Sequence, residues 1–146
     1  PQDTNLQLAV TDKKGEINIY YQKEFSQLNT TDEDIAKEHF GNKFKSKKVQ
    51  CDTIQNILKK SEYDNKKIDF LNIDIEGGEE KVLKSLNFEI YDPSVICVEI
   101  LGYRSMEKNE KETNIRNDNI YKILVDKKYK KVWSGPYYCS HIFTKS

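Results

Sequence analysis

The sequence predicts a single α/β domain built around an open sheet, and three segments carry this prediction. Residues 68–75 are rich in apolar and β-branched side chains, Gly77 and Gly78 break that run before a helical pattern, and residues 95–100 form a second apolar run. A strand, a helix and a strand in this order make a right-handed crossover, which places the two strands parallel in one sheet. The 146 residues suffice for one core, so we expect one domain spanning residues 1–146.

The N-terminal third of the chain predicts one hairpin and two short helices. Residues 5–10 and 16–21 alternate apolar with polar side chains around a turn that contains Gly15, as hairpin strands do. The polar stretch 22–50 predicts a helix over residues 32–40, with Thr31 as its N-cap, and is otherwise expected to be peripheral. Asp52 is the predicted N-cap of a second short helix.

The remainder of the chain predicts the sheet and a closing hairpin. Residues 68–75 are expected to be a central, parallel strand covered on both faces, followed by a helix over residues 79–86. Residues 102–118 are polar and without periodicity, which favours a functional loop. Asp118 is expected to cap a further helix, and residues 131–133 and 139–144 to pair as the closing hairpin.

Charge and composition exclude several classes of partner. The 24 Lys and Arg residues balance 24 Asp and Glu residues and are interleaved with them, so no uniform field is available for a nucleic acid or an anionic membrane. No stretch approaches the roughly 20 apolar residues of a membrane span. Three widely separated cysteines predict neither a disulfide framework nor a zinc site. We expect a cytoplasmic protein without nucleic-acid or membrane partners; the sequence leaves its oligomeric state open.

Three carboxylates are the candidate functional residues. Ligands of open α/β sheets bind outside the carboxyl ends of the strands, where Asp74, Glu76 and Glu99 fall. Carboxylates that converge there can bind Mg²⁺, orient a hydroxyl group or accept a proton, so this set is the predicted catalytic and metal-binding site. The alternative is that Asp74 or Glu76 caps the following helix and Glu99 neutralises a Lys or Arg. The adjacent glycines favour a functional site, because they allow close approach of the backbone to a ligand.

The residues around this set resemble a known family. The segment Asp74-Ile75-Glu76-Gly77-Gly78-Glu79 resembles the D-x-E-G-x-E signature of FkbM-type methyltransferases, which follows an apolar strand and runs into a helix with a Val-Leu pair, here Val82-Leu83. Residues 9–12 are similar to an earlier strand of the family, residues 53–58 to its short helix and residues 93–99 to its strand ending in Glu. The resemblance covers about residues 6–100.

The resemblance implies a fold, a methyl donor and an acceptor. The fold would be a class I, Rossmann-like sheet, mostly parallel with an antiparallel C-terminal hairpin. The donor would be S-adenosylmethionine, with Mg²⁺ as an optional second cofactor, and the acceptor a hydroxyl group of a sugar, glycan or small metabolite. Asp74 and Glu76 would lie near the sulfonium and the acceptor, with Glu99 beside them. The expected cofactor-binding residues are Val10, Thr11, Asp12 and Asp74, and the loop 102–118 would face the acceptor.

One part of the family pattern is missing. Family members begin with a strand and a glycine-rich turn that hold the methionine end of the donor, but no G-x-G-x-G precedes Leu6. Residues 1–146 are therefore expected to be a partial domain without the N-terminal cofactor-binding strands, inactive alone. Two alternatives stay open, a Mg-dependent phosphoryl-transfer or phosphoacceptor domain and a catalytically silent α/β binding module.

Overall fold

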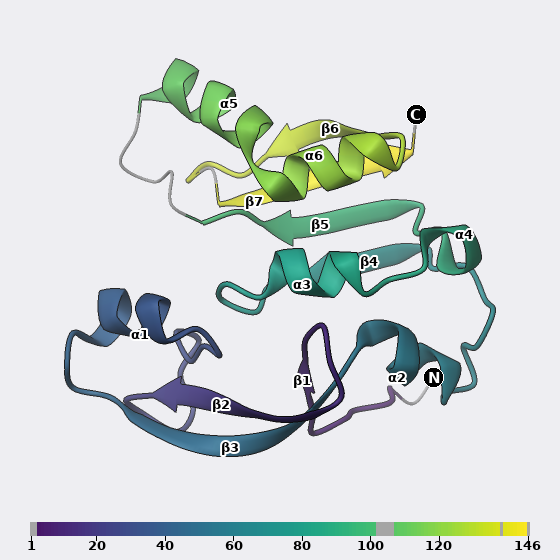
Figure 1. Ribbon diagram of the computed structural model, residues 1–146. Helices are drawn as coiled ribbons and strands as arrows, with labels where there is room; N and C mark the ends of the chain where they lie inside the picture. Colours follow the sequence, from purple (N-terminus) through teal and green to yellow (C-terminus); the bar gives the residue numbers. More distant parts are fainter. Residues whose placement is uncertain (1–2, 102–106, 138, 146) are drawn as a thin grey trace.

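The computed structural model describes residues 3–101, 107–137 and 139–145, which form two sheets and six helices (Figure 1). The three-stranded sheet has the order β1-β3-β2 and the four-stranded sheet the order β4-β5-β7-β6. The strands are β1 Ala9–Val10, β2 Gly15–Tyr21, β3 Lys45–Asp52, β4 Phe70–Ile73, β5 Val95–Glu99, β6 Tyr129–Ser134 and β7 Ser140–Lys145. The helices are α1 Glu33–Phe40, α2 Ile54–Lys59, α3 Glu79–Lys84, α4 Phe88–Tyr91, α5 Lys108–Asn117 and α6 Asn119–Asp126.

The four-stranded sheet contains the predicted strand-helix-strand unit. β4 and β5 are adjacent and parallel, and α3 lies in the connection between them, which confirms that prediction. The closing hairpin of β6 and β7 is also confirmed, as is the helix α6 capped by Asp118. Helices α3 and α6 lie side by side against this sheet (Figure 1). The core between them contains Val82, Leu83, Ile96, Val98, Leu124 and Phe143.

The predicted N-terminal hairpin is wrong. β1 and β2 pair with β3 instead, β1 in parallel and β2 in antiparallel orientation. β3 lies in the polar stretch that was expected to be peripheral. Most of its residues are polar and exposed, and its sequence lacks the alternation of apolar and polar residues that marks a strand. Its backbone pairs on both edges, and that pairing depends on two other segments rather than on its own side chains.

The expectation of a mostly parallel sheet is also wrong for the described residues. Parallel pairing joins β1 to β3 and β4 to β5, whereas β2–β3, β5–β7 and β6–β7 are antiparallel. β4 is an edge strand of its sheet rather than a central one, and Phe70 on it is 58% exposed. Apolar side chains reveal which faces a strand can bury, but the number of its neighbours is decided by other segments.

Three local predictions need correction. Helix α1 is capped by Asp32 rather than Thr31, and α2 by Thr53 rather than Asp52. The predicted loop 102–118 contains helix α5, whereas residues 102–106 lie outside the described residues. Helix α5 is almost entirely polar and is anchored by the fully buried Ile115, so its sequence lacks the apolar periodicity of a typical helix. In the described part of the chain, no helix has the length and apolar character that crossing a membrane requires.

Asp52 joins β3 to α2 through a buried carboxylate. It accepts hydrogen bonds from Lys60 Nζ at 2.8 Å, Asn56 Nδ2 at 2.8 Å and the Thr53 backbone N–H at 2.9 Å. The hydrogen bond from Lys60 is the largest cause that lowers the pKa of Asp52 from 3.8 to about 2. A carboxylate whose pKa is depressed by folding stabilises the fold above its unfolded pKa, and this contribution is lost as the pH falls through the folded pKa.

We expect Asp52→Asn to have a lower melting temperature than the wild type at neutral pH. The difference between the two melting temperatures is expected to shrink as the pH falls from about 4 to about 2, where the wild-type carboxylate becomes protonated. Thermal unfolding of both proteins across this range measures the effect. Asp126→Asn, on an exposed side chain, is the control and is expected to leave the acid transition unchanged. A constant difference between Asp52→Asn and the wild type at every pH would contradict the prediction.

Candidate functional site

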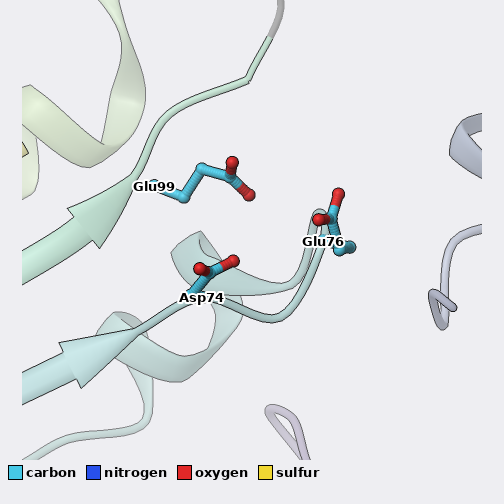
Figure 2. A group of neighbouring side chains, drawn as sticks. All are labelled: Asp74, Glu76 and Glu99. Atoms are coloured by element: carbon cyan, nitrogen blue, oxygen red, sulfur yellow. The ribbon is translucent and has the colours of Figure 1, made fainter. Parts of the chain in front are cut away.

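The three predicted carboxylates meet at one edge of the four-stranded sheet (Figure 2). Asp74 directly follows β4, Glu76 lies in the next loop, and Glu99 is the last residue of β5. Because β4 and β5 are parallel and in register at their ends, these side chains reach the same place. One oxygen from each lies within 4.8 Å of the others, which confirms the predicted convergence. Asp74 is exposed, Glu76 is half-buried and Glu99 is 8% exposed.

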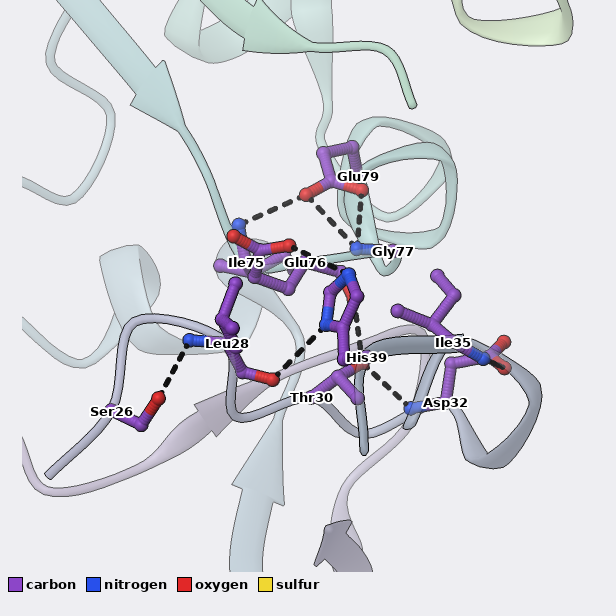
Figure 3. Close-up of polar contacts among 10 residues, drawn as sticks. All are labelled: Ser26, Leu28, Thr30, Asp32, Ile35, His39, Ile75, Glu76, Gly77 and Glu79. Carbon is purple, nitrogen blue, oxygen red and sulfur yellow. Dashed lines mark hydrogen bonds and ion pairs between the residues drawn. The ribbon is translucent and has the colours of Figure 1, made fainter. Parts of the chain in front are cut away.

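The loop between β4 and α3 is held by Glu79, the last residue of the signature. Its carboxylate accepts hydrogen bonds from the backbone N–H groups of Ile75 at 2.9 Å and Gly77 at 3.0 Å (Figure 3). Burial is the largest influence on this group and raises the pKa of Glu79. Helix α3 has Gly78 as its N-cap and no side-chain cap, so the alternative that Asp74 or Glu76 caps it is wrong.

Glu76 is held from a second direction by the segment that leads into α1. The buried Thr30 donates a hydrogen bond from Oγ1 to the backbone carbonyl of Glu76 at 2.5 Å (Figure 3). His39 Nε2 lies 3.9 Å from Glu76 Oε2, and His39 Nδ1 contacts the Leu28 carbonyl at 3.3 Å. Glu76 itself has φ 56°, a left-handed conformation that is uncommon for a residue with a side chain. Strained backbone of this kind concentrates at functional sites.

The two glycines of the loop have a structural role that the sequence did not reveal. Gly77 has φ 108°, and a Cβ atom there would lie 2.1 Å from Cδ1 of Ile35 on α1. A Cβ atom on Gly78 would lie 2.7 Å from Cδ1 of Ile75. A side chain at either position would therefore collide with Ile35 or Ile75, which gives both glycines a packing role besides any contact with a ligand.

The carboxylates line a cavity of about 530 Å³, which is within the size range of small-molecule sites. Much of its remaining wall comes from the turn between β6 and β7, on the side of the sheet where β5 ends (Figure 1). The other described lining residues are Gln27, Trp133, Gly135, Pro136, Tyr137, Cys139 and Ser140. Sequence reasoning missed this wall and assigned it to residues 102–118. The only sequence feature that marked this wall was the turn at Gly135 and Pro136. The turn is far from Asp74 along the chain, so nothing in the sequence indicated that it lies beside the carboxylates.

The predicted adenine-binding turn lies apart from this cavity. Val10 lines a separate hollow with Thr30 and Ile75, and Asp12 lines another with Gly77 and residues of α3. Thr11 is buried and donates a hydrogen bond from Oγ1 to Asp12 Oδ1 at 3.1 Å. The structure thus gathers Asp74, Glu76 and Glu99 in one cavity but does not place residues 10–12 among its lining residues.

The two histidines differ in their relation to the site. His39 is half-buried on α1 and contacts Glu76, a long-range contact that no local pattern indicates. His141 is fully buried in β7, where Nδ1 lies 3.0 Å from Oγ of Ser134.

Comparison with known proteins identifies the family. The model of the methyltransferase FkbM domain matches residues 1–130, which is most of the chain. No curated protein and no solved structure gives a significant match. The family implies a Rossmann-like fold and methyltransferase activity, and the match confirms the resemblance seen in residues 74–79 and their flanks. The chain therefore belongs to the FkbM methyltransferase family.

Proposed function

We propose that this protein transfers a methyl group from S-adenosylmethionine to a hydroxyl oxygen of a small-molecule or glycan acceptor. The observation that carries the proposal is the convergence of Asp74, Glu76 and Glu99 within 4.8 Å, at the carboxyl ends of two parallel strands, in a chain of the FkbM family. Ligands of α/β sheets bind at this edge.

The sulfonium end of the methyl donor is proposed to lie at this cavity. S-adenosylmethionine carries a positive sulfonium whose methyl group is electrophilic, and a cluster of carboxylates attracts such a cation. Asp74 and Glu76 are the residues proposed to lie at the sulfonium, with Glu99 beside them. The adenine end is proposed, as the resemblance implies, to lie near residues 10–12. Nothing in the family match supports Mg²⁺, so the mechanism does not use it.

The chain's own contribution is to orient the acceptor and to accept its proton. A hydroxyl group is a weak nucleophile near neutral pH, and a carboxylate within hydrogen-bonding reach acts as general base during the attack. Glu76 is suited to this role because Thr30 and the loop held by Glu79 fix its backbone before any ligand binds. Fixed placement of the oxygen in line with the methyl group supplies a large part of the acceleration.

The product of methyl transfer tests this proposal. The protein from the complete reading frame, supplied with isotopically labelled S-adenosylmethionine and a panel of hydroxyl-bearing acceptors, is expected to form a methyl ether. An ether keeps its label in mild base, whereas a methyl ester loses it, so base treatment followed by mass spectrometry distinguishes oxygen acceptors of the two kinds. A product with the label on a carboxylate, nitrogen or carbon atom would contradict the assignment to a hydroxyl group.

A further inference from the structure

Much of the described wall of the cavity comes from one hairpin, and this part is called the hairpin wall below. Its residues lie at the end of β6, in the turn and at the start of β7, and they are Trp133, Gly135, Pro136, Tyr137, Cys139 and Ser140. All of them lie beyond residue 130, where the match to the family model ends. What the family implies therefore does not extend to the hairpin wall.

One ion pair ties this hairpin to helix α5, which lies at the same end of the sheet as the turn (Figure 1). Lys131 Nζ on β6 donates hydrogen bonds to both carboxylate oxygens of Glu112 on α5, at 2.7 Å and 2.9 Å. The side chain of Lys131 is 12% exposed, whereas the other lysines in ion pairs of the described residues are 41–75% exposed. An ammonium group so far removed from water depends on its partner, so this pair differs from an ordinary surface pair.

The same ammonium group also reaches the hairpin wall. Lys131 Nζ donates a hydrogen bond to Oγ of Ser134 at 2.8 Å, and Nδ1 of the buried His141 lies 3.0 Å from that oxygen. Ser134 stands between Trp133 and Gly135, which both line the cavity. Ser134 is therefore held from both strands of the hairpin and, through Lys131, from Glu112 on α5.

The hairpin needs such a tie because its own pairing is irregular at this place. The register of β6 against β7 shifts between Lys131 and Trp133, and a shift of this kind interrupts the ladder of backbone hydrogen bonds. Trp133 is 49% exposed and Tyr137 is 75% exposed, so solvent rather than core surrounds much of each ring. The contact from Glu112 through Lys131 to Ser134 supplies a support beside the interruption.

We infer that Glu112 and Lys131 are positioning residues of the proposed methyltransferase. Their ion pair holds Ser134, and through it Trp133 and the rest of the hairpin wall, in the place where the acceptor binds. This inference rests on the proposed function, because an acceptor whose hydroxyl group reaches Glu76 occupies the cavity that the hairpin wall lines. Neither Glu112 nor Lys131 is among the described lining residues, so both act through the wall and not on the reacting atoms.

Acrylamide quenching of tryptophan fluorescence tests the ion pair without any ligand, because Trp133 is the only tryptophan of the chain. Glu112→Ala removes one partner at a position far from Trp133 along the chain, and it is expected to raise the quenching constant of Trp133. Glu110→Ala removes the same charge from an exposed position of the same helix and is the matched control. Equal quenching constants for the two variants would overturn the inference.

Lys131→Met breaks the same ion pair from the side of the hairpin. Methionine keeps an apolar stem of similar length but has no ammonium group, so the quenching constant is expected to rise as in Glu112→Ala. The double variant is expected to show no further increase, because both changes remove one contact. Lys145→Met is the control on the hairpin, since Lys145 pairs with Asp92 at the other end of β7.

Circular dichroism checks that each variant is folded. If Lys131→Met does not fold, Glu112→Ala still decides the question, because the Glu112 side chain is more exposed than that of Lys131 and its removal strands less charge in the interior. Additive increases in the double variant, or an equal increase in Lys145→Met, would overturn the role of the ion pair.

Steady-state kinetics of the complete protein test the positioning of the acceptor. The substrate is the acceptor of the panel on which the wild type forms the labelled ether. Glu112→Ala is expected to raise the KM for this acceptor by roughly tenfold, because a wall that is no longer held in place must be ordered when the acceptor binds. The kcat and the KM for S-adenosylmethionine are expected to change little. A lowered melting temperature with an unchanged KM for the acceptor would show a merely structural role and overturn the inference.

The failure of this inference and the failure of the proposed function give different results. If the wild type forms the ether and Glu112→Ala leaves the KM for the acceptor unchanged, the positioning role is wrong and the proposed function stands. If the wild type transfers no methyl group to any acceptor of the panel, the proposed function is wrong. The quenching of Trp133 then still decides whether the ion pair holds the hairpin wall.

Discussion

Glu76→Gln is expected to reduce the rate of methyl transfer by roughly 10²–10⁴-fold, the range that removal of a general base produces. Glutamine preserves the shape of the side chain but cannot accept a proton at neutral pH. The backbone around Glu76 is held by Thr30 and by the loop hydrogen bonds of Glu79, none of which involves the Glu76 carboxylate. The Glu76 carboxylate oxygen lies 3.9 Å from His39 Nε2, a distance too long for a hydrogen bond, so the change of this contact is expected to cost little folding stability.

Methyl transfer and thermal unfolding are to be measured on the same preparation of Glu76→Gln in the complete protein. A large loss of kcat with a nearly unchanged melting temperature supports the role in catalysis. Glu80→Gln is the matched control, because Glu80 lies nearby on α3 and pairs with Lys84 away from the cavity. Full activity of Glu76→Gln with a lowered melting temperature would make Glu76 a structural residue and the site assignment wrong.

Glu79→Ala is expected to be strongly destabilising, although Glu79 is a charged residue at the start of the short helix α3. Its buried carboxylate is the acceptor for the N–H groups of Ile75 and Gly77, and alanine leaves both donors without it. A buried donor that loses its acceptor costs about 1–3 kcal/mol, so the combined loss is expected to exceed that of most single substitutions. The loop carries Glu76, so methyl transfer is expected to fall as well.

Urea unfolding of this chain measures the free energy of unfolding for Glu79→Ala and for its neighbour Glu80→Ala. Glu80 forms a partly exposed ion pair, and its removal is expected to cost about 1 kcal/mol or less. Glu79→Gln is expected to be intermediate, because the amide oxygen still accepts one of the N–H groups. Equal losses for the two alanine variants would show that Glu79 does not hold the loop.

The sequence by itself determined the centre of the candidate site. The apolar runs around β4 and β5, separated by a helical segment, predict two parallel strands joined by a right-handed crossover, and the structure pairs them. The residues that follow such strands meet at one edge, so the convergence of Asp74, Glu76 and Glu99 follows from the order of these segments along the chain. The D-x-E-G-x-E signature also indicated the family that the comparison confirmed.

Tertiary structure alone decided which segments complete the sheets and surround the carboxylates. The polar β3 became the centre of the three-stranded sheet, and β4 an edge strand, because pairing depends on which distant backbones approach. Contacts between distant segments also placed the residues around the carboxylates. Thr30 and His39 contact Glu76, and Ile35 packs beside Gly77. Trp133 lines the cavity although it is far from Asp74 along the chain. Local periodicity reports the faces that one segment can bury, and contacts between distant segments leave no trace in it.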